Sequence, residues 1–219
     1  DALIILFKRI IYKKFNKNVS NLLRLGIVNE LQYDNIHKRN RKEIILDGYW
    51  QSETYFYKHK KQIKEILNSS KELLKLGFNL DSYQVAVHVR AGDYHSNKKV
   101  RKQHLVCDLS WFKKSIRYLK KINPDFKFTI FTDDVDFVER NFYEFKDIKI
   151  QIPDNFKDAN TDLYKMSNFK NFIISNSSYS WWASYLGETE NSIIIAPEYW
   201  FNGVRTKNLP IYRSNWILL

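Results

Sequence analysis

The chain has 219 residues, of which 44% are hydrophobic, while glycine and proline are few, at 6 and 4 residues. This composition excludes a disordered, collagen-like or linker-rich protein and predicts one large or two small compact domains. The 36 Lys and Arg residues exceed the 24 Asp and Glu residues by 12, which favours an anionic partner such as a phosphate, nucleic acid or an anionic membrane face.

Cysteine and histidine usage limits the redox and metal chemistry of the chain. The single cysteine, Cys107, excludes an internal disulfide and a thiolate-rich zinc site, and the five histidines lack metal-ligand spacing. The apolar run at residues 2–7 ends at Lys8, far short of the roughly 20 residues that cross a bilayer. We therefore expect a cytoplasmic protein without a membrane-spanning helix.

The first part of the chain, residues 1–83, has a mostly helical pattern. An amphipathic helix is predicted at residues 4–25, a short strand at Ile44–Leu46, and a further helix at residues 52–76 that ends at Gly77. This part carries 16 basic and 9 acidic side chains, and its excess of 7 positive charges includes a basic run at residues 37–42. We predict that residues 1–83 form a separate, mostly helical domain.

The second part, residues 84–219, alternates short apolar runs with helical windows. The five runs are VAVHV at 85–89, KFTIF at 127–131, IKIQI at 148–152, NFIIS at 171–175 and SIIIA at 192–196. Helical windows lie between them at residues 110–121, 135–145, 158–167 and 178–187. Such a series predicts a Rossmann-like domain, in which parallel strands are buried on both faces and joined by crossover helices.

Polar residues follow the first of these strands, at the edge where α/β sheets bind ligands. His88, Arg90 and Asp93 place an imidazole, a guanidinium and a carboxylate there, and Gly92 allows close approach of a ligand to the backbone. This combination suits a diphosphate. The alternative is a surface ion pair between Arg90 and Asp93 with His88 in the core.

Carboxylates follow the second strand. Asp133 or Asp134 is suited to accept the paired N–H donors of guanine, although capping of the next helix is the commoner use. Asp134 and Asp136 also form a DxD pattern of the kind that holds a divalent metal against a sugar diphosphate. We favour the reading without metal, because Arg90 and the positive net charge can neutralise a diphosphate.

Two further segments, one rich in hydroxyl groups and one rich in aromatic residues, are candidates for ligand binding. The stretch from Asn176 to Trp182 opens a predicted helix, whose first N–H groups can bind phosphate oxygens. The stretch at 47–56 sets Trp50 and Gln51 among polar groups, a composition typical of sugar binding, with a turn and a Ser52 helix cap as the alternative.

Five blocks in this chain resemble those of the bacterial α-1,2-fucosyltransferases, which are inverting enzymes that use GDP-fucose. The blocks are DGYWQSETYF at 47–56, HVRAGDY at 88–94, FTDD at 131–134, SNSSYSWWASYL at 175–186 and APEYWF at 196–201. The resemblance implies two Rossmann-like domains that face a cleft (the GT-B type). Residues 1–83 would form a partial domain on the acceptor side, and residues 84–219 would bind the nucleotide of the donor. The chain departs from the family at Ala91, where the motif has a second arginine, and in lacking a GGLGNQ-type loop. The first departure predicts weaker donor affinity.

The same resemblance implies the reaction and the residues that carry it. L-fucose would pass from GDP-β-L-fucose to the 2-hydroxyl of a galactose-type acceptor in a surface glycan such as an O-antigen, without metal or a separate cofactor. Arg90, Ser177, Ser178 and Ser180 would hold the phosphate; His88, Gly92, Asp133, Asp134 and Asn176 the rest of the donor; and Trp50 and Gln51 the acceptor. Asp93 and Glu53 are both candidates for the catalytic base.

Other functions fit parts of the sequence. Basic stretches favour a non-catalytic domain that binds nucleic acid or an anionic surface, and the DxD pattern favours a metal-dependent glycosyltransferase. A glycan-binding protein with a decayed transferase site is a further alternative. We expect the transferase, with no nucleic-acid partner, and the basic first half is compatible with peripheral attachment to the inner face of the membrane.

Overall fold

The computed structural model describes residues 27–29, 45–47, 51–55, 57–68, 81–92, 106–145, 148–151, 159–201 and 211–219. The chain divides into two compact units, residues 1–50 and residues 51–219. In the first unit, strand β1 (Ile27–Asn29) pairs in parallel with β2 (Ile45–Asp47). The strand predicted at Ile44–Leu46 is thus confirmed, whereas the helix predicted at 4–25 and the basic run lie outside the described residues.

The second unit contains a six-stranded sheet in which every strand pair is parallel. Its strands are β3 (Gln84–Val89), β4 (Lys127–Thr132), β5 (Ile148–Gln151), β6 (Asn171–Ile173), β7 (Ile194–Ala196) and β8 (Ile217–Leu218). All five predicted strands are confirmed. Strand β8 was not predicted, because two residues are too few to show a periodic pattern.

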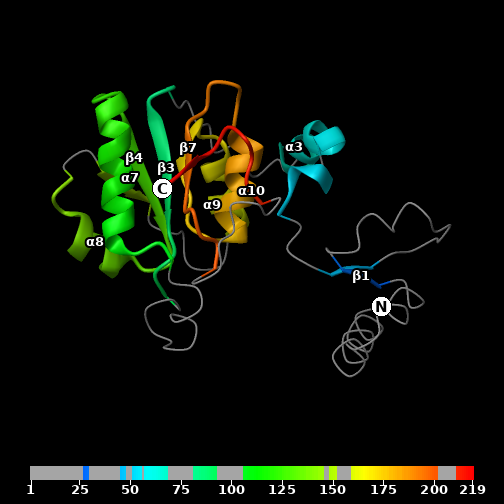
Figure 1. The fold of residues 1–219 in the computed structure, drawn as a ribbon, viewed down its shortest axis with the longest axis horizontal. Coiled ribbons are helices and arrows are strands. Elements are labelled where there is room, and N and C mark those ends of the chain that lie inside the picture. Colours follow the sequence, from blue (N-terminus) through cyan, green and yellow to red (C-terminus); the bar gives the residue numbers. More distant parts are fainter. Residues whose placement is uncertain are drawn as a thin grey trace. The chain divides into compact units, whose positions relative to one another are not determined.

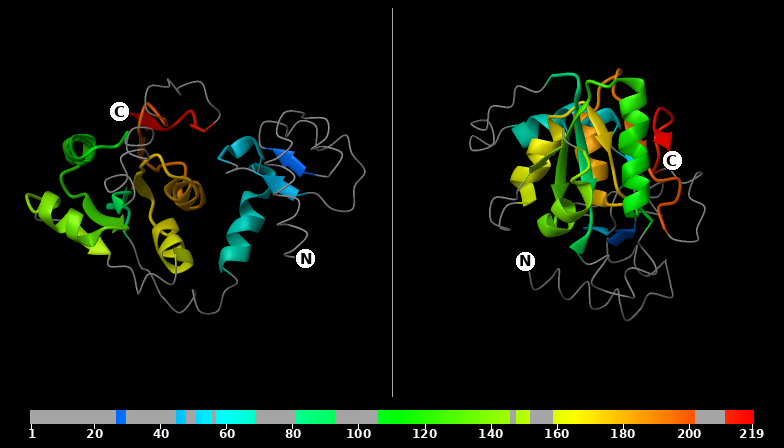
Figure 2. Two further views of the ribbon diagram at one scale, coloured as in Figure 1. Left: turned by 90° about the horizontal axis from the view of Figure 1, so that it is seen from below. Right: turned by 90° about the vertical axis from the view of Figure 1, so that its left-hand side faces the viewer.

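Two pairs of helices cover the two faces of this sheet (Figures 1 and 2). They are α7 (Leu109–Ile122), α8 (Val135–Phe142), α9 (Ala159–Ser167) and α10 (Ser178–Gly187). Alternate residues of β3 separate the two cores: Val85 and Val87 pack on the face of α7 and α8, and Ala86 packs on the face of α9 and α10. The α/β prediction and its four helical windows are confirmed.

The strand order places a switch point between β3 and β6. The sheet runs β5-β4-β3-β6-β7-β8, so the chain builds outward from β3 to β5 and then returns to build outward from β6 to β8. In open α/β sheets of this kind, ligands bind at the carboxyl ends of the two strands where the direction reverses. The residues after Val89 and after Ile173 are therefore the first place to look for a site.

The start of the second unit differs from its predicted form. Residues 53–55 and 57–59 form two short 3₁₀ turns, η2 (Glu53–Tyr55) and η3 (Tyr57–His59), before helix α3 (Lys60–Asn68) begins. The run Thr54 to Tyr57 consists of β-branched and aromatic residues, which are weak helix formers. Ser52 accepts a hydrogen bond from the Thr54 amide at 3.4 Å, so the predicted cap opens a tight turn instead of a long helix.

Among the helices that the structure describes, none has the length and apolar character needed to cross a membrane. The arrangement of two domains about a cleft stays a prediction.

Candidate functional site

The residues after β3 are held by a carboxylate that directly follows the neighbouring strand β4. Asp133 accepts hydrogen bonds from the backbone N–H groups of Ala91 at 2.8 Å and Gly92 at 3.1 Å through Oδ1. Its Oδ2 lies 3.1 Å from Nη1 of Arg90. Asp133 thus sets the path of the loop and the direction of the guanidinium, whose side chain is 38% exposed. A positioned and accessible cation results at the switch point.

Gly92 lies close against this carboxylate. A Cβ atom added at Gly92 would meet Oδ2 of Asp133 at 3.0 Å, which is closer than an ordinary van der Waals contact. A larger residue at position 92 would therefore displace the Asp133 carboxylate, which accepts a hydrogen bond from the Gly92 N–H. The prediction that Gly92 allows a ligand close to the backbone is not tested by this contact.

His88 joins the two strands of the switch point. Its Nδ1 lies 2.8 Å from Oγ of Ser175, just after β6, and its ring lies 5.3 Å from the ring of Tyr179 on α10. The side chain is buried, and burial lowers the pKa of His88 to about 4 against the opposing influence of Asp133. His88 is therefore neutral at physiological pH and can offer hydrogen bonds without adding charge.

The N-terminus of α10 opens on the same edge of the sheet. Ser177 is the N-cap residue, and its side chain makes no capping hydrogen bond. The N–H groups of Ser178, Tyr179 and Ser180 occupy the first turn, where an α-helix provides no backbone acceptor. They give this edge of the sheet, where Arg90 also follows a strand, a partial positive charge.

Two of the predicted polar residues hold this turn in place. The buried hydroxyl of Ser180 donates to the carbonyls of Ser175 at 3.1 Å and Ser177 at 3.2 Å. The amide of Asn176 donates from Nδ2 to the carbonyl of Trp200 at 3.0 Å, which ties the turn to the segment after β7. Both side chains are thus engaged with the protein, and Ser177 and Ser178 provide the more accessible hydroxyls.

The DxD pattern is used locally. Asp134 caps α8 by accepting a hydrogen bond from the Phe137 amide at 2.9 Å, and Asp136 lies in the first turn of that helix. No group of three or more His, Cys, Asp or Glu side chains suited to a metal ion occurs within the described ranges. Independence from metal stays a prediction.

The remaining predicted residues do not join this group. Glu53 pairs with Arg213, whose Nε lies 2.9 Å from Oε2, and Arg213 in turn contacts Glu188 at the opposite end of α10. Gln51 is buried in the same segment as Glu53. Asp93 and Trp50 lie outside the described residues.

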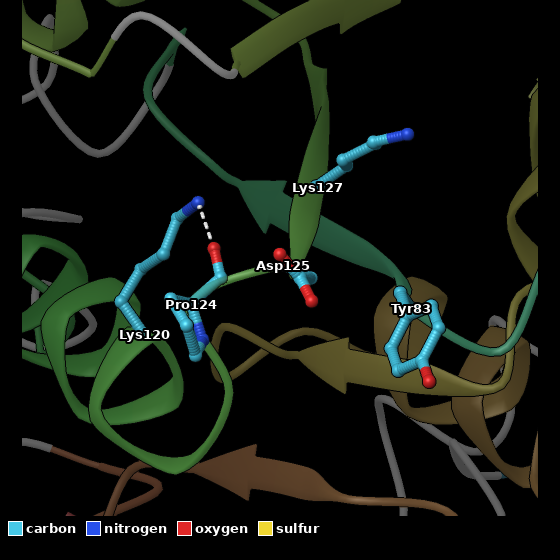
Figure 3. A pocket seen from close by; sticks show the side chains of 5 residues that line it. All are labelled: Tyr83, Lys120, Pro124, Asp125 and Lys127. Carbon is cyan, nitrogen blue, oxygen red and sulfur yellow. Dashed lines mark hydrogen bonds between the residues drawn. The ribbon is translucent and has the colours of Figure 1, made fainter.

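A pocket of about 330 Å³ lies at the amino ends of β3 and β4 (Figure 3). Tyr83 precedes β3, Lys127 begins β4, and the other lining residues come from the end of α7 and the turn before β4. The lining residues are Tyr83, Lys120, Pro124, Asp125 and Lys127. Lys120 donates to the carbonyl of Pro124 at 2.8 Å across this pocket. It therefore lies at the amino ends of the strands, away from the switch point.

Sequence reasoning missed the role of Ser175. Ser175 ends the apolar run at 171–175, and its hydroxyl contacts His88, which lies 87 positions earlier. A serine that closes an otherwise apolar strand was the available signal. Cys107, which no prediction used, is buried, and burial raises the pKa of its thiol above the usual value.

The sequence has recognisable relatives. The model of glycosyl transferase family 11 matches residues 6–219. The chain belongs to this family. Membership of family 11 confirms the resemblance drawn from the five sequence blocks.

Two curated relatives of this family 11 chain are proteins of Escherichia coli. One is an alpha-1,2-colitosyltransferase, 33% identical over 187 residues, which are 78% of this chain and 60% of that protein. The other is the O-antigen biosynthesis glycosyltransferase WbnK, 30% identical over 183 residues, which are 80% of this chain and 60% of that protein. The match therefore spans about three fifths of the length of each relative.

Proposed function

We propose that this family 11 chain binds a GDP-activated 6-deoxy sugar and transfers it, with inversion, to the 2-hydroxyl of a galactose-type sugar in a bacterial surface glycan. The observation that carries the proposal is the arrangement of Arg90 and the N-terminus of α10 on the two strands of the switch point. The names of the two relatives, which include an α-1,2 linkage and O-antigen synthesis, support the linkage and the acceptor class.

The departing diphosphate is the centre of the chemistry. Negative charge builds on its β-phosphate as the sugar leaves, and the guanidinium of Arg90 and the N–H groups of Ser178 and Tyr179 would stabilise that charge. Preorganised donors of this kind contribute on the order of 100-fold or more each to the rate. Asp133 holds Arg90 before the donor arrives, so little reorganisation is needed.

The nucleoside would lie towards β4 and the side chain of Asp134. His88 is neutral and fixed by Ser175, which suits it to hydrogen-bond the donor instead of moving a proton. We assign Asp133 mainly to positioning the loop, because both of its oxygens are already bonded to residues 90–92.

Of the two candidates for the catalytic base, we favour Asp93. It follows Gly92 directly in the sequence, next to the loop that carries Arg90. Glu53 instead joins the Arg213 and Glu188 group at the far end of α10, and a ten-residue helix is about 15 Å long. The positioned base would remove the proton of the acceptor hydroxyl late in the displacement.

The transferred sugar is L-fucose or colitose. Colitose differs from L-fucose by the loss of one hydroxyl group, and the relative named for colitose transfer is 33% identical to this chain. A competition between GDP-fucose and GDP-colitose distinguishes the two donors, since a hydrogen bond to that hydroxyl would favour one of them by tenfold or more.

The decisive experiment is isothermal titration with GDP, UDP and ADP, followed by transfer assays with the two GDP-sugars. We expect GDP binding in the wild type and its loss in Arg90→Ala, with circular dichroism unchanged. The matched control is Arg117→Ala, because Arg117 is an exposed arginine on α7 that bonds to Glu144. Donor binding and transfer at wild-type levels in a folded Arg90→Ala protein would falsify the proposal.

A second measurement separates the proposal from its rivals. Transfer should persist in EDTA. Activity that is lost in EDTA and then restored by Mn²⁺ would favour a metal-dependent glycosyltransferase that uses the DxD pattern. Nucleic-acid affinity that falls steeply with salt, without any response to GDP, would favour a basic binding domain.

A further inference from the structure

Two aromatic side chains are exposed just after β7, beside the candidate site. Tyr199 is 40% exposed and Phe201 is 37% exposed, whereas Trp200 between them is only 3% exposed. The buried tryptophan thus anchors a segment that presents an aromatic ring on either side of it. Nothing in the proposed donor chemistry requires these two rings.

The segment is firmly attached to the rest of the unit. The ring of Trp200 packs edge-on against that of Tyr212 at 5.9 Å, and the Tyr212 hydroxyl donates to the carbonyl of Pro197 at 2.8 Å. The backbone N–H of Glu198 donates to the carbonyl of Leu219 at 3.1 Å. Rings on a fixed backbone lose little conformational freedom when a ligand stacks on them.

The segment also touches the start of α10. The hydrogen bond from Asn176 to the Trp200 carbonyl places Tyr199 and Phe201 one residue away from a backbone group that contacts the residue before the N-cap of α10. In the sheet, β7 lies next to β6 on the side away from β3 and β4. A ligand with its diphosphate at the switch point and its base towards β4 therefore extends its sugar end towards β7.

We propose that Tyr199 and Phe201 form a stacking surface for a sugar ring in the transfer reaction. The inference rests on the proposed function and adds a sugar subsite to it. Hexose rings present patches of C–H groups that pack on aromatic faces, and such faces are a common way to hold a sugar. The ring is either the transferred sugar of the donor or the galactose-type acceptor, because both have the same stacking chemistry.

The test uses the complete chain with Tyr199→Ala, Phe201→Leu and the double variant. Tyr199→Phe keeps the ring and serves as the conservative control. Tyr143→Ala removes an 82% exposed tyrosine next to α8 and serves as the remote control. Three quantities are measured: the affinity for GDP, the affinity for GDP-fucose, and binding of a free galactoside by saturation-transfer NMR.

We expect GDP affinity to stay within twofold in every variant, because GDP lacks the transferred sugar. A fall of about fivefold to tenfold in GDP-fucose affinity in Tyr199→Ala assigns the surface to the donor sugar, and a similar fall in galactoside binding assigns it to the acceptor. Tyr199→Phe should retain most of the affinity. Either fall supports the proposal.

Unchanged affinities for both sugars in the folded double variant would overturn the inference while leaving the proposed function intact. A wild-type protein that binds no GDP would instead overturn the proposed function. The galactoside measurement needs no donor, so it still decides whether the aromatic surface binds a sugar.

Discussion

Two charged groups, one at the sheet edge where α10 begins and one at the C-terminal end of α10, differ in solvent exposure and in their number of partners. After β3 and β4, at the sheet edge where α10 also begins, Arg90 and Asp133 form an ion pair whose side chains are 38% and 27% exposed. At the C-terminal end, Glu188 is 2% exposed and pairs with Lys60 at 2.8 Å and with Arg213. An accessible pair can exchange partners with a ligand, whereas a buried group with several partners joins distant parts of the chain.

The C-terminal group, which we call the Glu188 cluster, consists of Glu188, Lys60, Arg213, Glu53 and Trp216. The indole of Trp216 donates to Oε2 of Glu188 at 3.4 Å, and Lys60 lies 4.5 Å from the ring centre of Tyr185. Burial and the neighbouring Arg213 lower the pKa of Lys60 to about 8 against the opposing influence of Glu53. The cluster attaches residues 53–60 to the end of the sheet unit, so its expected effect is on stability.

The largest effect should follow from breaking the Glu188 cluster. Glu188→Gln leaves the cations Lys60 and Arg213 without their buried carboxylate, and we expect the free energy of unfolding to fall by about 3–5 kcal/mol. Urea denaturation measures the change, and Glu190→Gln, at an exposed glutamate two residues later, is the control. If Glu188→Gln is as stable as the control, the cluster does not hold this segment.

The next effect concerns pH and the buried His88. Its pKa is about 4 in the folded protein and near 6.5 in the unfolded chain, so the unfolded state binds the proton first as the pH falls. Stability from this group is fully present above pH 6.5 and is lost between pH 6.5 and pH 4, by up to about 3 kcal/mol. Denaturation across this range should show a weaker pH dependence in His88→Gln, and an identical slope would contradict the assignment.

Two glycines give a matched steric comparison between the same two ends. An added Cβ at Gly187 would lie 2.5 Å from the ring of Phe172 and 2.7 Å from the Ser167 carbonyl, whereas at Gly92 it would meet only the Asp133 carboxylate. We expect Gly187→Ala to lower the free energy of unfolding by about 1–3 kcal/mol, because backbone cannot move aside easily. Gly92→Ala should cost less stability but weaken GDP binding.

Thermal melting and GDP titration test both variants. A larger loss of stability in Gly92→Ala than in Gly187→Ala, or a loss of GDP binding in Gly187→Ala alone, would contradict this comparison.

The smallest effect on stability is expected at Arg90. Its ion pair with Asp133 is partly exposed, and such pairs contribute about 0–1 kcal/mol. Arg90→Gln should therefore melt close to the wild type while losing most of its GDP affinity. A loss of several kcal/mol in unfolding free energy would show that the pair has a structural role like that of the Glu188 cluster.

Much of the fold followed from local patterns. The apolar runs at 85–89 and 127–131 match β3 and β4 closely, and the predicted helix at 178–187 has the bounds of α10. The polar residues after these strands were also found, because a buried strand must end where polar side chains begin. Helix 52–76 was misjudged in its first turns, where aromatic residues and Ser52 favour 3₁₀ turns.

The sequence alone determined the α/β character of residues 84–219 and the candidates His88, Arg90 and Asp133, since strand periodicity and strand ends depend on neighbouring residues. Only the tertiary structure decided which groups meet: His88 with Ser175, and Lys60 with Glu188 across 128 positions. Such contacts depend on the order in which strands assemble. That order is set by packing of the whole sheet, and local patterns do not record it.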